Sequence, residues 1–118
     1  MIPRNRILLV DDDPSGLAML GLALKRTGFN VETASGSEEA LRLLCRKPFQ
    51  WMVTDARMHP FSGFLLTLEA KRIQPALRIV MVSAVAGEGD LAGYPIEHLF
   101  PKPVAVDVPG TLAILELG

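Results

Sequence analysis

The chain has 118 residues, of which 49% are hydrophobic and 21% are charged. This length and composition predict one globular domain over residues 1–118 and exclude a low-complexity chain. The formal net charge of -1 gives no electrostatic reason for direct binding to nucleic acid or to an acidic membrane. Because the sequence has neither a signal-peptide core nor a run of about 18 apolar residues, we expect a cytoplasmic protein that is not in the membrane.

A short apolar run at residues 7–10 leads directly into three carboxylates. Such a run predicts a strand buried on both faces, and its carboxyl end is where open α/β sheets bind ligands. Two ionised carboxylates about 4 Å apart repel by roughly 4 kcal/mol at an effective dielectric constant near 20, and a hard cation such as Mg²⁺ would relieve this repulsion. Asp13 precedes Pro14 and is predicted to cap a helix, which leaves Asp11 and Asp12 for the ion.

Two predicted helices with a strand between them come next. Residues 14–27 place apolar side chains at helical spacing and end at Gly28. Residues 29–33 alternate apolar and polar side chains, which favours a strand at the edge of the sheet. Ser35 and Glu38 have the spacing of a capping box and predict the start of a second helix.

The only cysteine, Cys45, lies in this second helix. A single cysteine excludes an internal disulfide and a cysteine metal cluster. Because leucines precede it directly, we expect Cys45 to pack in the helical core, without a chemical role.

A third predicted strand, residues 49–54, ends directly before Asp55. A loop then leads into a predicted helix at residues 64–73, in which we expect Leu65 and Leu68 to face inward. This strand therefore also delivers a carboxylate at its end.

The last part of the chain carries the clearest buried strand, residues 78–82, which Ser83 follows directly. Glycine and proline weaken the helical pattern over residues 84–95, so the fourth helix is predicted to be short. A fifth strand is predicted at residues 96–100. The tail at residues 109–117 has the length for only about two helical turns.

Five alternations of strand and helix predict an α/β fold with a doubly wound, mostly parallel sheet and helices on both faces. Right-handed crossovers bring all carboxyl ends of the strands to one edge, so the polar residues at those ends are expected to converge. Taken singly, each residue is weak evidence for a function. At the end of a strand, Asp usually forms a turn, Ser usually caps a helix and Lys is usually solvated. Together they indicate a functional site. Its members are Asp11, Asp12, Asp55, Ser83 and Lys102.

These motifs resemble those of response-regulator receiver domains, the CheY-like family, over nearly the whole chain. The matching motifs are Leu-Leu-Val-Asp-Asp-Asp at 8–13, Asp-Ala-Arg-Met at 55–58, Gly63, Val-Ser-Ala at 82–84 and Lys-Pro at 102–103. The resemblance implies a flavodoxin-like, five-stranded sheet in the order 2-1-3-4-5. It also implies that residues 1–118 are one receiver domain.

By this resemblance, Asp55 is the phosphoacceptor and one ligand of a Mg²⁺ or Mn²⁺ ion. Asp12 would bind the ion directly and Asp11 would bind it through water. The backbone carbonyl of Arg57 would complete the protein ligands. The ion would neutralise charge, because a carboxylate is a poor nucleophile toward an anionic phosphoryl group.

The resemblance also assigns residues that would bind the phosphoryl oxygens. Ser83, Ala84 and Lys102 take this role, and Lys102 would also take up negative charge as it develops. Ser83 and Leu99 occupy the positions of the family's conformational switch. The acyl phosphate adds about -1.5 to -2 charge units. The loops that carry these residues can move in response to the added charge.

The implied function is that of a phosphorelay protein, which assists only its own phosphorylation and dephosphorylation. The implied partners are a sensor histidine kinase or a phosphotransfer protein, an output partner or domain, and a second copy of the chain. Two positions depart from the family pattern. His59 stands where proline is usual, with Pro60 next, and we expect a solvated loop histidine. Leu99 stands where an aromatic residue is usual, and Phe100 follows it.

Two alternative functions stay open on the sequence alone. A phosphatase of the haloacid-dehalogenase type also uses an Asp-x-Asp pair after its first strand, and Asp11 and Asp13 have this spacing. A degenerate receiver would act as a binding module without phosphorylation. The identity of the phosphorylated aspartate separates the first alternative from the receiver, and failure to accept a phosphoryl group would favour the second.

Overall fold

The computed structural model describes residues 6–83 and 92–101. The elements in chain order are β1 (Arg6–Val10), α1 (Pro14–Arg26), β2 (Asn30–Ala34), α2 (Ser37–Arg46), β3 (Trp51–Asp55), α3 (Gly63–Ile73), β4 (Arg78–Ser83) and β5 (His98–Pro101). The segments expected to form the weak fourth and fifth helices lie largely outside the described residues. So do Ala84 and Lys102.

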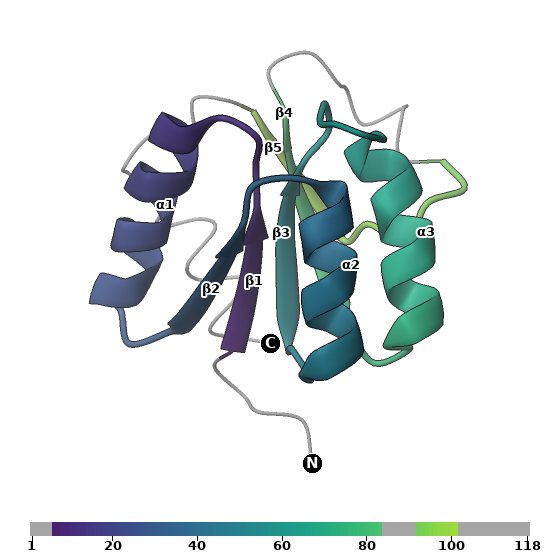
Figure 1. Cartoon of the computed structure of the whole chain (residues 1–118), viewed down its shortest axis with the longest axis horizontal. Coiled ribbons are helices and arrows are strands. Elements are labelled where there is room, and N and C mark those ends of the chain that lie inside the picture. Colours follow the sequence, from purple (N-terminus) through teal and green to yellow (C-terminus); the bar gives the residue numbers. More distant parts are fainter. Residues whose placement is uncertain (1–5, 84–91, 102–118) are drawn as a thin grey trace.

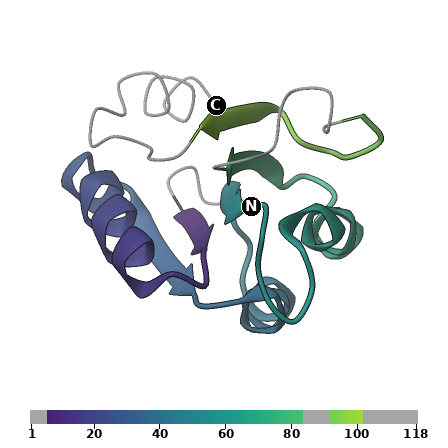
Figure 2. The same cartoon turned by 90° about the horizontal axis from the view of Figure 1, so that it is seen from above.

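The five strands form one parallel sheet in the order β2-β1-β3-β4-β5 (Figure 1). Helix α1 covers one face of this sheet, and α2 and α3 cover the other, as the view from above shows (Figure 2). The predicted α/β class, the doubly wound architecture and the 2-1-3-4-5 order are therefore confirmed. The prediction that β2 lies at an edge is also confirmed.

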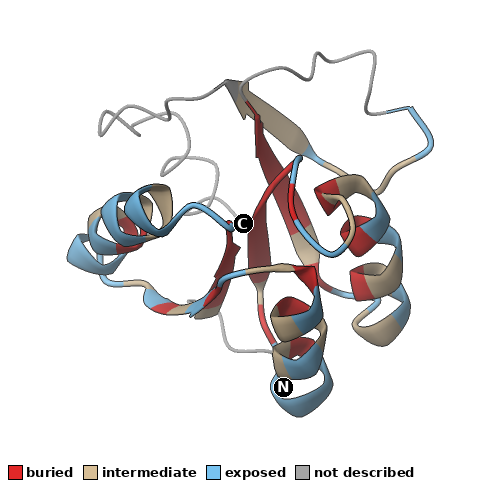
Figure 3. Cartoon of the chain, turned by 45° about the horizontal axis from the view of Figure 1, so that its top comes forward, coloured by how far each residue is buried: buried red, intermediate tan, exposed pale blue. Residues whose placement is uncertain are grey.

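Alternate residues of the central strands supply two apolar cores, one on each face of the sheet. Strand β1 shows this directly, since Leu8 and Val10 face α2 and α3 whereas Ile7 and Leu9 face α1. The strands β1, β3 and β4 are the most deeply buried part of the chain (Figure 3). The carboxyl ends of these strands are consequently held between two packed layers.

Helix α1 begins as predicted, because Asp13 caps it. The Asp13 carboxylate accepts hydrogen bonds from the backbone amides of Ser15 at 3.2 Å and Gly16 at 3.3 Å. These amides belong to the first turn, which has no partner within the helix. The carboxylate of Asp13 is therefore committed to the helix start.

Helix α2 starts at Ser37, which shows that the predicted capping box of Ser35 with Glu38 is wrong. The backbone amide and hydroxyl of Ser35 instead donate to Glu39 Oε2, at 3.3 Å and 2.9 Å. The helix start is set by a long-range contact, since the Ser37 amide donates to the backbone oxygen of His59 at 3.2 Å. This contact could not be predicted from the local spacing of polar residues, because His59 is distant in the sequence.

The buried face of α3 also differs from the prediction. Leu65 and Leu68, which were expected to face inward, are 50% and 43% exposed. The buried positions are Gly63, Leu66, Thr67 and Ala70, which have the i, i+3, i+4, i+7 spacing of one helical stripe. Because the stripe begins at Gly63, the docking of that glycine sets the rotation of the helix.

Cys45 is exposed, so the prediction that it packs in the core is wrong. The buried face of α2 contains Ala40 and Leu44 instead. Cys45 is the next residue after Leu44, and one step along an α-helix turns the side chain by about 100° away from that face.

None of the helices within residues 6–83 and 92–101 combines the length and the hydropathy that a bilayer-spanning segment needs.

Candidate functional site

The end of β1 delivers two aspartates with different environments. Asp11 is 5% exposed, and its backbone amide donates to the carbonyl oxygen of Ala34 at 3.1 Å, which extends the β1–β2 ladder by one bond. Its Oδ1 accepts a hydrogen bond from the Asp13 amide at 2.9 Å. Asp12 is more open, with 35% of its side chain exposed. The strand end therefore presents one buried and one accessible carboxylate.

Asp55 is the last residue of β3 and is 9% exposed. The amide of Ala56 donates to Asp55 Oδ1 at 2.8 Å and so orients the carboxylate. Gly63 packs against the same strand end, because its amide donates to the Ala56 oxygen at 2.9 Å. A Cβ atom at position 63 would lie 1.8 Å from the Asp55 backbone oxygen, so no side chain fits there.

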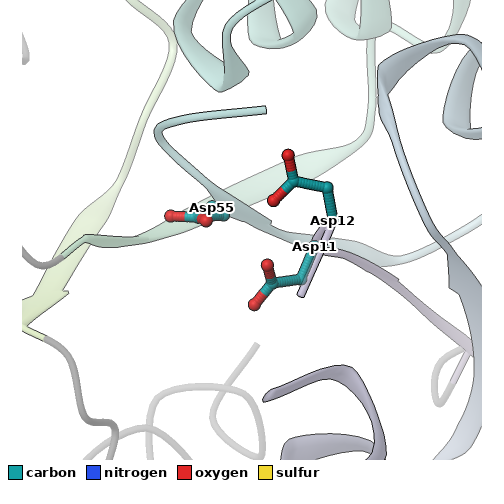
Figure 4. Close-up of side chains that lie close together, drawn as sticks. All are labelled: Asp11, Asp12 and Asp55. Atoms are coloured by element: carbon teal, nitrogen blue, oxygen red, sulfur yellow. The ribbon is translucent and has the colours of Figure 1, made fainter. Parts of the chain in front are cut away.

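The three aspartates converge at one edge of the sheet, as predicted (Figure 4). One carboxylate oxygen each from Asp11, Asp12 and Asp55 lies within 4.8 Å of the others. Carboxylates at this separation repel one another unless a cation or protons compensate their charge. Three oxygen ligands in a cluster suit a hard divalent cation, which prefers carboxylate and water oxygens.

Ser83 reaches the same edge from β4. The register pairs Asp55 with Val82, so Ser83 stands one residue beyond the Asp55 level on the neighbouring strand. It is 3% exposed and is the last residue of β4. Leu99 lies on β5 opposite Met81 and is partly buried. Ser83 therefore lies at the edge of the sheet where the three aspartates converge, and Leu99 lies on the adjoining strand.

The loop after Asp55 contains the remaining predicted ligand, Arg57, whose side chain is exposed. This loop is tied to the start of α2, since the amide of Phe61 donates to Ser37 Oγ at 3.2 Å. The peptide bond between His59 and Pro60 is cis. The backbone that carries the Arg57 carbonyl is thus held between β3 and α2.

One neighbour of the cluster was not among the predicted site residues. His59 Nδ1 lies 3.3 Å from Asp12 Oδ2, and the imidazole is 93% exposed. The expectation of a solvated loop histidine is confirmed, but the contact with Asp12 was not foreseen. Its only signal in the sequence is the histidine itself, which stands four residues after Asp55.

Comparison with curated proteins gives transcriptional regulatory proteins and response regulators. The chain is 35% identical over 104 residues to the transcriptional regulatory protein GlrR of Escherichia coli, covering 86% of this chain and 23% of that protein. It is 34% identical over 105 residues to a response regulator receiver protein of Anaeromyxobacter, covering 86% and 44%. The chain therefore spans less than half the length of these relatives.

Solved structures give the same fold. A CheY-like receiver domain from Methanospirillum hungatei is 24% identical, with a TM-score of 0.86 over 96% of this chain and 94% of that one. Thermotoga maritima TrrA, solved in complex with Mg²⁺ and BeF, is 25% identical, with a TM-score of 0.84 and coverages of 94% and 98%.

A third structure is that of a response regulator from Burkholderia pseudomallei, which contains a phosphorylated aspartic acid, a calcium ion and citrate. It is 26% identical, with a TM-score of 0.82 over 94% of this chain and 66% of that one. The family model of the response regulator receiver domain matches residues 7–95. The chain belongs to the response regulator receiver domain family of two-component signal transduction.

Proposed function

We propose that Asp55 accepts a phosphoryl group and that Asp11, Asp12, Asp55 and the Arg57 carbonyl hold the divalent cation that this transfer needs. The observation that carries the proposal is the convergence of three carboxylates within 4.8 Å at the ends of β1 and β3. An all-oxygen set suits Mg²⁺, or Mn²⁺ as a close substitute. When bound, the cation neutralises phosphoryl charge and aligns the reacting oxygens.

Each residue of the site has its own role in phosphoryl transfer, which follows from its position. An Asp55 carboxylate oxygen attacks phosphorus, a new O–P bond forms, and the bond from phosphorus to the donor breaks. The Ala56 amide holds the carboxylate in place through its bond to Oδ1. By the resemblance to the family, Ser83, Ala84 and Lys102 receive the phosphoryl oxygens, and Ser83 and Leu99 transmit the change.

The donor in the cell would be the phosphohistidine of a sensor kinase or of a phosphotransfer protein. Residues 1–118 would act as a single cytoplasmic receiver domain that assists only its own phosphorylation and dephosphorylation. Two of the longer relatives, GlrR and ZraR, are transcriptional regulatory proteins, which supports an output partner or domain as the target of the signal. A second copy of the chain is a further partner to test.

The haloacid-dehalogenase alternative finds no support in the geometry. It requires Asp13 to act at the reacting group, but Asp13 accepts hydrogen bonds from Ser15 and Gly16 as the cap of α1. The carboxylate beside Asp11 and Asp12 is Asp55 rather than Asp13.

The test is incubation with Mg²⁺ and a small acyl phosphate donor, followed by intact-mass measurement. We expect the wild-type chain and the Asp13→Asn variant to gain the mass of one phosphoryl group, whereas Asp55→Asn gains none. Addition of excess chelator should abolish the gain in the wild-type chain and in Asp13→Asn. Labelling of Asp55→Asn, or loss of labelling only in Asp13→Asn, would move the acceptor away from Asp55.

A further inference from the structure

The loop between β3 and α3 is held at both ends. At its start, the Ala56 amide donates to the Val82 oxygen of β4 at 3.2 Å, and at its end the Gly63 amide donates to the Ala56 oxygen at 2.9 Å. The side chain of Met58 is 6% exposed and packs in the apolar core on the face of the sheet that α2 and α3 cover. The peptide bond that carries the Arg57 carbonyl therefore lies within a loop that the fold restrains.

One residue at the start of α2 holds the middle of this loop. The Ser37 amide donates to the backbone oxygen of His59, and Ser37 Oγ accepts from the Phe61 amide, both at 3.2 Å. Ser37 is 0% exposed, so its hydroxyl is shielded from water. A Cβ atom at Gly36 would lie only 2.7 Å from the same His59 oxygen, which shows how closely the loop approaches the start of α2.

We propose that Ser37 is a positioning residue for the cation: it fixes the loop that presents the Arg57 carbonyl, and so it sets the affinity of the site for a divalent ion. This inference rests on the proposed function. Mg²⁺ demands near-octahedral geometry with ligand distances of about 2.0–2.1 Å, so a ligand carbonyl that moves with its loop binds the ion more weakly. Without Oγ, the Phe61 amide loses its bond to Ser37, and of these two hydrogen bonds only the one to His59 remains.

The competing explanation is that Ser37 only stabilises the fold. A buried hydroxyl that takes part in a hydrogen bond contributes to stability wherever it lies, so a loss of stability alone does not separate the two explanations. Thr67 offers a matched control. It is also 0% exposed, and its hydroxyl donates to the Phe64 oxygen at 2.7 Å within α3 rather than to the loop.

The experiment is a titration of the full chain with MnCl₂, in which electron paramagnetic resonance measures the free Mn²⁺. Mn²⁺ is the close substitute for Mg²⁺ at an all-oxygen site. We expect Ser37→Ala to raise the Mn²⁺ dissociation constant at least about fivefold, because groups that orient a ligand affect metal affinity strongly. Thr67→Ala should change the constant by less than about twofold, since its hydrogen bond does not reach the loop. Both variants should lower the denaturant midpoint of unfolding.

Labelling of Asp55 by a small acyl phosphate donor gives a second readout. In Ser37→Ala, the Mg²⁺ concentration that gives the half-maximal rate should rise by the same factor as the Mn²⁺ dissociation constant. The rate at saturating Mg²⁺ should change by less than about twofold, because the reacting carboxylate is unaltered. A purely structural role of Ser37 would leave the Mg²⁺ dependence unchanged.

A second variant disturbs the same contact without removing the hydroxyl. Gly36→Ala places a methyl group against the His59 oxygen, so the loop must shift, and the Mn²⁺ dissociation constant should again rise. If Ser37→Ala does not fold, this variant decides the question.

An unchanged Mn²⁺ affinity in Ser37→Ala, or an equal loss of affinity in Thr67→Ala, would overturn the proposal. So would an unchanged affinity in Gly36→Ala. The variant Asp12→Asn tests the underlying site separately, and Mn²⁺ binding as tight as that of the wild-type chain would show that the proposed cation site itself is wrong. Failure of the Ser37 inference and failure of the proposed function therefore give different results.

Discussion

The contact between Gly63 and Asp55 shows how one residue positions the proposed acceptor. A Cβ atom at position 63 would overlap the Asp55 backbone oxygen at 1.8 Å and would approach the Ala56 Cα at 3.2 Å. Both of these are backbone atoms at the end of β3, so no side-chain rotation relieves the overlap. The first turn of α3 and the carboxylate of Asp55 are consequently fixed relative to each other.

The variant Gly63→Ala tests this contact. We expect the free energy of unfolding to fall by about 3 kcal/mol, because the helix start or the strand end must move. Chemical denaturation measures the change. Gly21→Ala is the matched control, since a Cβ there meets Leu9 and Thr33 at 3.7 Å and 3.8 Å, which are ordinary contacts. It should leave stability unchanged or raise it by up to about 1 kcal/mol. Equal stability of both variants would contradict this account.

At the residue scale, the sequence predicts the positions of the aspartates better than it predicts their contacts with neighbouring residues. Asp11, Asp12 and Asp55 could be placed together because each follows an apolar strand and parallel strands end at one edge. The cap at Asp13 was local and therefore also predictable. The His59 contact with Asp12 joins residues 47 positions apart through loop geometry, which no periodicity encodes.

At the scale of elements, Gln74 joins three segments at the end of the sheet opposite the carboxylates. Its Nε2 donates to the backbone oxygens of Leu44 at 2.7 Å and Lys47 at 2.5 Å. Its Oε1 accepts from the Phe49 amide at 3.0 Å. One side chain thus satisfies a carbonyl in the last turn of α2, the carbonyl of its C-cap Lys47 and the amide of the segment that enters β3.

The variant Gln74→Met removes these bonds while it keeps the length of the side chain. We expect a loss of about 2–3 kcal/mol in the free energy of unfolding, since a typical hydrogen bond contributes about 1 kcal/mol. Lys71→Met, in the last turn of α3, removes an exposed bond to the Pro75 oxygen and a Coulombic interaction with Glu97, and should change stability by about 0.5 kcal/mol or less. Urea denaturation compares the two variants, and similar losses would argue against the joining role of Gln74.

An ion pair links the start of β4 to the residue before β5. Arg78 Nη2 lies 2.7 Å from Glu97 Oε1, and the Arg78 guanidinium lies 4.3 Å from the centroid of the Trp51 ring. The hydrogen bonds with Arg78 lower the pKa of Glu97, and the same bonds raise the pKa of Arg78. The arginine therefore stays charged at any pH at which the glutamate titrates.

The lowered pKa of Glu97 predicts a pH dependence with a definite sign. The pair stabilises the fold fully above the unfolded-state pKa of a glutamate, and this contribution is lost as the pH falls through the lower folded-state pKa. The difference in unfolding free energy between wild type and Glu97→Gln should therefore shrink on acidification. Denaturant titrations at neutral and acidic pH measure it, and a difference that grows in acid would contradict the assignment.

The two wrong predictions at this scale, the start of α2 and the buried face of α3, have the same cause. The hydrophobic pattern correctly gave the existence of α2 and α3, but the start of α2 and the rotation of α3 depend on long-range docking. Ser37 docks on the His59 oxygen, and Gly63 docks on Asp55. Leu65 and Leu68 are apolar enough to be taken for core residues, yet the docking of Gly63 turns them outward.

At the scale of the whole molecule, one apolar core on each face of the sheet holds the central strands, whose carboxyl ends meet at one edge. The class of the fold follows from the alternation of strand and helix, because parallel strands need crossover helices. The strand order does not follow from periodicity, since any right-handed arrangement has the same pattern along the chain. That part of the prediction came from the family motifs, and the 2-1-3-4-5 order confirms it.

The most direct measurement is a crystal structure of the chain grown with Mg²⁺ and a beryllium fluoride that mimics the phosphoryl group. We predict one Mg²⁺ ion with carboxylate oxygens of Asp12 and Asp55 about 2.1 Å away, and the beryllium atom bonded to an Asp55 carboxylate oxygen. Such a complex would place the acceptor and the ion at the shared ends of β1 and β3. A beryllium fluoride group bonded to Asp13, or an ion that contacts neither Asp12 nor Asp55, would contradict the central claim.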